Sequence, residues 1–96
     1  MSRAMAVSRH LAIHGRVQGV FYRGWAVETA RALGLSGWVR NRRDGSVEAV
    51  VTGDAAAVAD FVARCHGGPP AARVDRVDVT ETAPATAAGF EQRPTE

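Results

Sequence analysis

The sequence predicts one α+β domain whose elements follow in the order β-α-β-β-α-β. Three observations support this prediction. Apolar residues alternate in several short segments, they recur at helical spacing in two others, and glycine- or proline-rich breaks separate these segments. This order is that of the ferredoxin-like split βαβ sandwich, with two helices on one face of a four- to five-stranded, mostly antiparallel sheet. Because 96 residues can build only one core, we expect 1–96 to form a single domain, with 1–7 and 94–96 flexible.

The first half of the chain contains the first predicted strand and helix. Apolar residues alternate with polar or small ones over 9–13, which is the period of a half-buried strand. Over 22–33 they recur at helical spacing, and Gly34 is suited to end that helix. The segment 15–19 has neither period, so we predict a loop there.

The second half is predicted to form a hairpin, a second helix and further strands. Asp44-Gly45 is typical of a hairpin turn, and Asp54 is a good N-cap. The predicted ranges are 37–41 and 46–52 for the hairpin strands, 54–66 for the helix, 74–80 for the next strand and 89–91 for a short edge strand.

Two strand ends are predicted to meet at one edge of the sheet. A right-handed helical crossover makes strands 9–13 and 37–41 parallel, with 46–52 between them. Their carboxyl ends then share an edge, where the loop 15–19 follows one strand and Asn41 closes the other. We therefore expect a functional site at this edge.

The segment from Gly15 to Arg23 has the features of an anion-binding loop. Its two glycines permit positive φ and close backbone approach, and N–H groups of a loop before a helix can converge on an anion. In the first helical turn, the guanidinium of Arg23 offers a fork of donors that matches two phosphate oxygens. A tight turn and a solvated surface arginine are the alternative interpretations.

Asn41 is the only asparagine of the chain. Asparagine is disfavoured within strands, and it often opens turns, so its simplest role is to begin the hairpin turn. Its functional alternative is to position a water molecule.

Together these segments resemble the paired signatures of the acylphosphatases. The matching residues are Gly15-x-Val17-Gln18-Gly19-Val20-x-Tyr22-Arg23 and Gly37-Trp38-Val39-Arg40-Asn41-x-x-x-Gly45-x-Val47-x-x-x-x-x-Gly53. Similarity continues over roughly residues 8 to 93. Tyr22 departs from the phenylalanine or methionine usual in the family, and its hydroxyl, if buried, needs a partner, because an unmade hydrogen bond costs about 1 to 3 kcal/mol.

The resemblance implies an enzyme that hydrolyses acyl phosphates to a carboxylate and inorganic phosphate, without a cofactor. It implies that Arg23 binds the phosphoryl group and Asn41 orients the attacking water. The implied backbone phosphate ligands are Arg16, Val17, Gln18, Gly19 and Val20. The partners expected are a small acyl phosphate as substrate and inorganic phosphate as product and inhibitor.

Neither signature contains Asp, Glu or His, so the water's proton is expected to pass to the substrate's own phosphate oxygen. We predict a broad pH plateau of activity, not one controlled by His14 or Asp44. A metal site is not expected either, because His10 and His14 lie about 13 Å apart on an extended strand.

Composition excludes several other classes of protein. Lysine is absent, which excludes a lysine Schiff base, and Cys65 is the only cysteine, so no intramolecular disulfide forms. No apolar run is long enough to span a bilayer, and the first residues do not resemble a signal segment, so we expect a cytoplasmic monomer without membrane contact.

The main alternative is a non-catalytic ferredoxin-like module that binds a ligand or RNA. A net charge of +2 and a third strand, 46–52, without aromatic residues disfavour nucleic acid as a partner.

Overall fold

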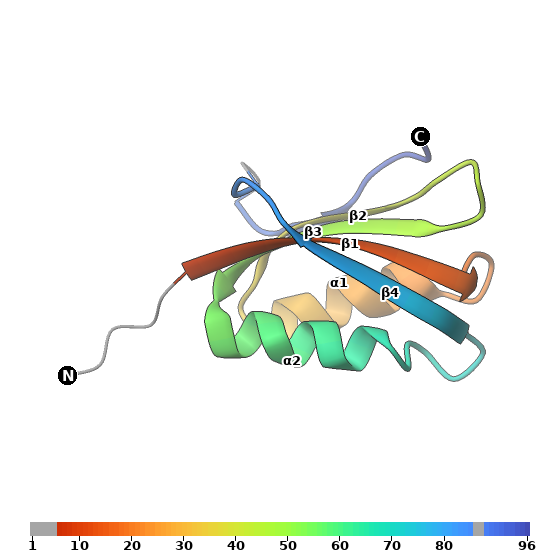
Figure 1. The fold of residues 1–96 in the computed structure, drawn as a ribbon, viewed down its shortest axis with the longest axis horizontal. Coiled ribbons are helices and arrows are strands. Elements are labelled where there is room, and N and C mark those ends of the chain that lie inside the picture. Colours follow the sequence, from red (N-terminus) through yellow and green to blue (C-terminus); the bar gives the residue numbers. More distant parts are fainter. Residues whose placement is uncertain (1–5, 86–87) are drawn as a thin grey trace.

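A computed structural model describes residues 6–85 and 88–96 (Figure 1) and has the predicted order of elements, with a fifth strand at the end. The elements are β1 (Ala6–Arg16), α1 (Tyr22–Ala32), β2 (Ser36–Asn41), β3 (Val47–Asp54), α2 (Ala55–Cys65), β4 (Arg73–Glu81) and β5 (Phe90–Gln92).

The strands form one five-stranded sheet in the order β4-β1-β3-β2-β5. β1 and β2 each pair antiparallel with β3, so they run parallel to each other, as predicted. β5 pairs parallel with β2, which confirms the expected edge strand. Both helices lie on the same side of the sheet (Figure 1), so the fold class predicted from the sequence is confirmed.

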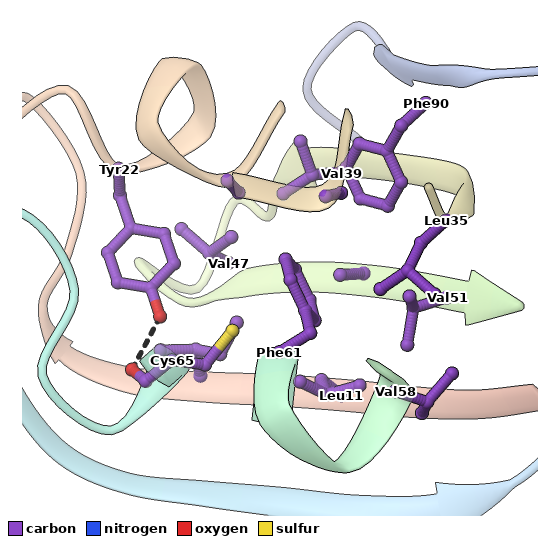
Figure 2. Close-up of a cluster of buried hydrophobic side chains, with 14 of the residues drawn as sticks. Leu11, Tyr22, Leu35, Val39, Val47, Val51, Val58, Phe61, Cys65 and Phe90 are labelled. Carbon is purple, nitrogen blue, oxygen red and sulfur yellow. Dashed lines mark hydrogen bonds between the residues drawn. The ribbon is translucent and has the colours of Figure 1, made fainter. Parts of the chain in front are cut away.

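The core fills the layer between the helices and the sheet (Figure 2). Leu11 of β1, Val51 of β3 and Phe61 of α2 are fully buried there. Phe61 packs against Phe90 of β5 with ring centroids 5.8 Å apart. Burial of a side chain of this size stabilises the fold by about 1.5 to 3 kcal/mol, so the phenylalanine helps to hold β5 against the helices.

Two helix ends lie where the sequence predicted them, at the N-cap Asp54 and at Gly34. Asp54 caps α2, since its Oδ2 accepts a hydrogen bond from the Ala57 N–H (3.4 Å). Gly34 follows α1 with a φ of 71°, a conformation that glycine adopts without strain. None of the helices in the described part of the chain is long and apolar enough to cross a membrane.

The first strand is longer than predicted. Gly15 and Arg16 belong to β1 and pair with Val74 and Arg73 of β4, after a register shift between His14 and Gly15. At Gly15, φ is 131° and an added Cβ would lie 2.2 Å from the Arg73 carbonyl oxygen, so only glycine fits this close approach. The prediction of a loop beginning at residue 15 was therefore wrong, and the loop begins at Val17.

The two chain ends predicted to be flexible are only partly described. Residues 1–5 lie outside the described part of the structure. Ala6 and Val7 begin β1, and the Glu96 N–H donates to the Asn41 carbonyl oxygen (3.1 Å). Mobility at residues 1–7 and 94–96 stays a prediction.

Candidate active site

The loop between β1 and α1 lies at the same end of the molecule as the β2–β3 turn (Figure 1). Val17 anchors it in the core, with 1% of its surface exposed. The side chain of Gln18 donates from Nε2 to the carbonyl oxygens of Arg42 (2.7 Å) and Ser46 (2.8 Å). These two hydrogen bonds fix the loop relative to the turn that follows Asn41.

The N-terminus of α1 has no side-chain cap. Its N-cap residue, Phe21, adopts the left-handed conformation with φ 66° and ψ 21°, and its side chain makes no capping hydrogen bond. The first turn contains no acidic residue. The free N–H groups and the positive end of the helix dipole are therefore not neutralised locally, which makes this end suited to an anion.

Arg23 and Asn41 line one small cavity at this helix end. Its volume is about 130 Å³, which corresponds to about four water molecules. The lining residues are Val17, Gly19, Phe21, Tyr22, Arg23, Gly24, Asn41 and Gln92. The shared edge of β1 and β2 thus brings together the two side chains that the sequence singled out, although they are 18 positions apart in the chain.

Arg23 carries a charge that no carboxylate in the described ranges neutralises. It is half-buried, and none of the ion pairs among residues 6–85 and 88–96 includes it. A guanidinium stays protonated at any physiological pH. The cavity is therefore positively charged.

Asn41 contributes an acceptor without a donor. Its Oδ1 is buried and has no hydrogen-bond partner in the described part of the chain. A buried oxygen left unpaired costs about 1 to 3 kcal/mol. Such atoms are rare in native proteins, so this one is suited to receive a hydrogen bond from a bound molecule.

The residues whose backbone was predicted to bind phosphate differ in their position relative to the cavity. Val17 and Gly19 line the cavity, and Gly19 has a φ of 74°, so its backbone adopts the conformation that the loop prediction required. Arg16 pairs with Arg73 at the end of β1, and Val20 packs against the core. Neither of these two lines the cavity, and neither does Gln18, whose side chain bonds the β2–β3 turn instead.

The sequence did not single out Phe21, Gly24 or Gln92 for the site. Gln92 reaches it because β5 pairs in parallel with β2, with Gln92 opposite Val39. The weakly patterned segment that ends in Gln92 contained no signal for this placement. The left-handed conformation of Phe21 is likewise invisible in the sequence, because such a φ is normally reserved for glycine or asparagine.

His14 and Asp44 are engaged outside the cavity. His14 Nε2 lies 3.3 Å from Asp78 Oδ2 on β4. Hydrogen bonds from the hydroxyl and the N–H of Ser46 to Asp44 Oδ1 (2.6 and 2.9 Å) lower the pKa of Asp44. Neither side chain lines the cavity.

The hydroxyl of Tyr22 has the partner that its burial requires. It donates to the Cys65 carbonyl oxygen at 2.6 Å (Figure 2). Burial raises the pKa of Tyr22 far above its usual value, so the phenol stays neutral. Burial also raises the pKa of the Cys65 thiol to about 12. The departure at Tyr22 is therefore accommodated by a hydrogen bond between α1 and α2.

The fold and this edge define a ferredoxin-like α+β protein with a small cationic cavity at the carboxyl ends of two parallel strands. Comparison with known proteins is consistent with that class. The family model described as Acylphosphatase matches residues 9–92. An acylphosphatase of Acidovorax sp. (strain JS42) is 56% identical over 92 residues, which cover 96% of this chain and 95% of that protein.

Other relatives agree. An acylphosphatase of Rhodospirillum rubrum is 58% identical over 82 residues, covering 85% of this chain and 90% of that protein. The solved structure of an acylphosphatase from Coxiella burnetii superposes with a TM-score of 0.89 at 32% identity, covering 97% of this chain and all of that one. The chain belongs to the acylphosphatase family, enzymes that hydrolyse acyl phosphates to a carboxylate and inorganic phosphate.

Proposed function

We propose that this enzyme hydrolyses acyl phosphates with Arg23 holding the phosphoryl group and Asn41 positioning the attacking water. The observation that supports this division is that one cavity is lined by both Arg23 and Asn41. Within residues 6–85 and 88–96, the arginine has no carboxylate partner and the buried oxygen of the asparagine has no donor. One group is suited to an anion and the other to an O–H donor.

Arg23 and the backbone of the loop share the phosphate. The guanidinium donates two parallel hydrogen bonds to phosphoryl oxygens, and N–H groups of the loop that begins at Val17 and of the start of α1 face the same charge. In phosphoryl transfer the negative charge spreads over the equatorial oxygens, so fixed donors stabilise the transition state without reorganising. Gln18 holds this loop in place through the β2–β3 turn.

Asn41 holds the nucleophile. Its Oδ1 accepts a hydrogen bond from the water, whose oxygen attacks phosphorus in line with the leaving carboxylate. The new bond joins the water oxygen to phosphorus, while the bond between phosphorus and the acyl oxygen breaks and its electron pair leaves with the carboxylate. The water's proton passes to a phosphoryl oxygen, so no protein base takes part.

The reaction is proposed to need no metal or other cofactor, because Arg23 supplies the positive charge that a cation would bring to the phosphate. Inorganic phosphate, the product, is expected to compete for the same donors. A monomeric state, which size-exclusion chromatography would test, and a cytoplasmic location, which cell fractionation would test, complete the proposal.

An RNA-binding role is not favoured. On the face of the sheet away from the helices, the ring of Trp38 lies 4.6 Å from the Arg40 guanidinium and 5.0 Å from that of Arg93, measured to the ring centroid. These contacts occupy the aromatic surface on which a base would stack.

The experiment that tests the proposal is hydrolysis of benzoyl phosphate in excess EDTA, with Arg23→Ala as the variant. We expect turnover by the wild-type protein and none detectable in the variant, with both proteins folded by circular dichroism. Turnover that disappears with EDTA would contradict the metal-free mechanism. Phosphate binding without turnover in the wild-type protein would instead support the non-catalytic binding module.

A further inference from the structure

Phe21 has an unusual combination of properties for a large apolar residue. It is the only non-glycine residue with positive φ in the described part of the chain, at 66°. Its side chain is 65% exposed, although a phenyl ring gains free energy by leaving water. It also lines the cavity that contains Arg23 and Asn41. A strained backbone and an exposed ring at the mouth of an active site point to a role in binding.

Gly24 keeps this ring in position. A Cβ built at Gly24 would lie 2.2 Å from Cε1 and 2.4 Å from Cζ of Phe21. The ring therefore occupies the space that any other residue at position 24 would fill. Glycine within a helix is unfavourable relative to alanine. The room that Gly24 leaves for the ring of Phe21 explains why a glycine stands at this position of α1.

The size of the cavity assigns the ring to the acyl side of the substrate. A volume of about 130 Å³ accommodates a phosphoryl group and a water, whereas pockets for whole small molecules start at about 300 Å³. The acyl group must therefore lie at the mouth, where the exposed face of Phe21 is available. An aromatic acyl group can stack on such a ring, while an acetyl group covers little of it.

We infer that Phe21, seated on Gly24, is the specificity-determining residue for the acyl group and favours aromatic over small aliphatic acyl phosphates. This rests on the proposed function of the site, since it places the phosphoryl group at Arg23. The ring acts by binding and takes no part in the chemical step.

The test compares kcat/KM for benzoyl phosphate with kcat/KM for acetyl phosphate in each protein, so that the intrinsic reactivity of the two substrates cancels between variants. Phe21→Asn removes the ring but retains a residue that tolerates positive φ. Gly24→Ala displaces the ring with a better helix former, so it remains informative if Phe21→Asn does not fold. Phe21→Tyr is the matched control, because it keeps the ring.

We expect the benzoyl-to-acetyl ratio to fall about 3- to 10-fold in Phe21→Asn and in Gly24→Ala. The ratio should be unchanged in Phe21→Tyr, and inhibition by inorganic phosphate should be unchanged in all three. An unchanged benzoyl-to-acetyl ratio in Phe21→Asn and Gly24→Ala, with or without an equal loss for both substrates, would show that Phe21 only packs. That result would overturn this inference and leave the proposed function standing. Hydrolysis of neither substrate by the wild-type protein would overturn the proposed function and this inference with it.

Discussion

The arginine at the site, Arg23, and the arginines on the open face of the sheet differ in what surrounds them. On the open face, Arg40 Nε lies 2.6 Å and Arg42 Nη1 3.2 Å from Glu48 Oε1. His10 Nε2 lies 2.7 Å from the other carboxylate oxygen of Glu48. Arg23 has no such partner among the residues that the structure describes. Paired arginines hold strands together, whereas an unpaired one keeps its charge for a ligand.

The same contrast applies to the buried acceptors. The Glu48 side chain, 16% exposed, accepts hydrogen bonds at both oxygens. Burial alone would raise the pKa of Glu48, but the hydrogen bonds from His10 and Arg40 and the charges of Arg40 and Arg42 outweigh burial and lower it. Asn41 Oδ1 is buried, and the described part of the chain offers it no donor. The groups around Glu48 therefore stabilise the fold, whereas the unpaired oxygen of Asn41 costs stability and remains available to a ligand.

Arg23→Ala should give the largest effect and the clearest separation of the two regions. We expect kcat/KM for benzoyl phosphate to fall at least about 10³-fold, because the transition-state charge loses its main partner. The free energy of unfolding should change by less than about 0.5 kcal/mol, since no protein partner is lost. Kinetics and urea denaturation measure the two quantities. Arg64→Ala, in an exposed pair with Asp60 on α2, is the control that should leave turnover intact.

Asn41→Ala should lower turnover by about 10²- to 10³-fold while inhibition by inorganic phosphate persists, because only water positioning is lost. The free energy of unfolding should stay the same or rise by up to about 1 kcal/mol, because a buried unpaired oxygen is removed. Weakened phosphate inhibition equal to that of Arg23→Ala would contradict the separate roles of the two residues.

Gln18→Met should weaken both stability and phosphate binding, since Gln18 connects the two regions. Its two hydrogen bonds to the carbonyl oxygens of Arg42 and Ser46 are lost while the length of the side chain is kept. We expect a loss of about 1 to 3 kcal/mol in the free energy of unfolding and a rise of about tenfold in the phosphate inhibition constant. Unchanged inhibition by phosphate would show that the loop keeps its shape without the hydrogen bonds between Gln18 and the turn.

Glu48→Gln should affect stability alone. At pH 7 we expect a loss of about 1 to 2 kcal/mol in the free energy of unfolding, with kcat/KM unchanged. The pKa of Glu48 is lower in the folded state than its unfolded value of 4.5, so this contribution is present above pH 4.5 and is lost as the pH falls through the folded pKa. Urea denaturation at a series of pH values should show wild type and variant converging in acid. A constant difference down to the lowest pH would exclude the charge as its cause.

The smallest effect should be that of pH on catalysis. With His14 and Asp44 engaged outside the cavity and Arg23 always charged, kcat/KM should vary less than about threefold between about pH 5.5 and 8. A bell-shaped profile that flattens in His14→Gln or Asp44→Asn would overturn this expectation. Initial rates with benzoyl phosphate across this range, corrected for its spontaneous hydrolysis, provide the measurement.

Local patterns in the sequence predicted the fold and the edge of the sheet where the site lies, whereas the choice of Arg23 and Asn41 over their simpler interpretations came from the resemblance to the acylphosphatases. Alternation, helical spacing and turn residues defined the elements, and the right-handed crossover then put the end of β1 beside Asn41. Arg23 follows from its position in the first turn of α1.

The remaining features depend on contacts between distant segments. Gly15 and Arg16 are strand residues because β4 extends far enough to pair with them. Gln92 joins the site through its pairing with β2. The conformation of Phe21 is set by how the loop enters α1, and no side-chain periodicity reports a positive φ.

The position of β1 inside the sheet has a consequence for how the enzyme is made. Both edges of β1 are occupied, by β3 and by β4, and the latter comes from residues 73–81. During synthesis, the glycine loop and α1 therefore leave the ribosome before the strands β3 and β4, which pair with β1, have been made. Such distant pairings slow folding relative to helical bundles, whose contacts are mostly local. We expect nascent chains truncated before β4 to be inactive, and activity to appear only with completion of the sheet.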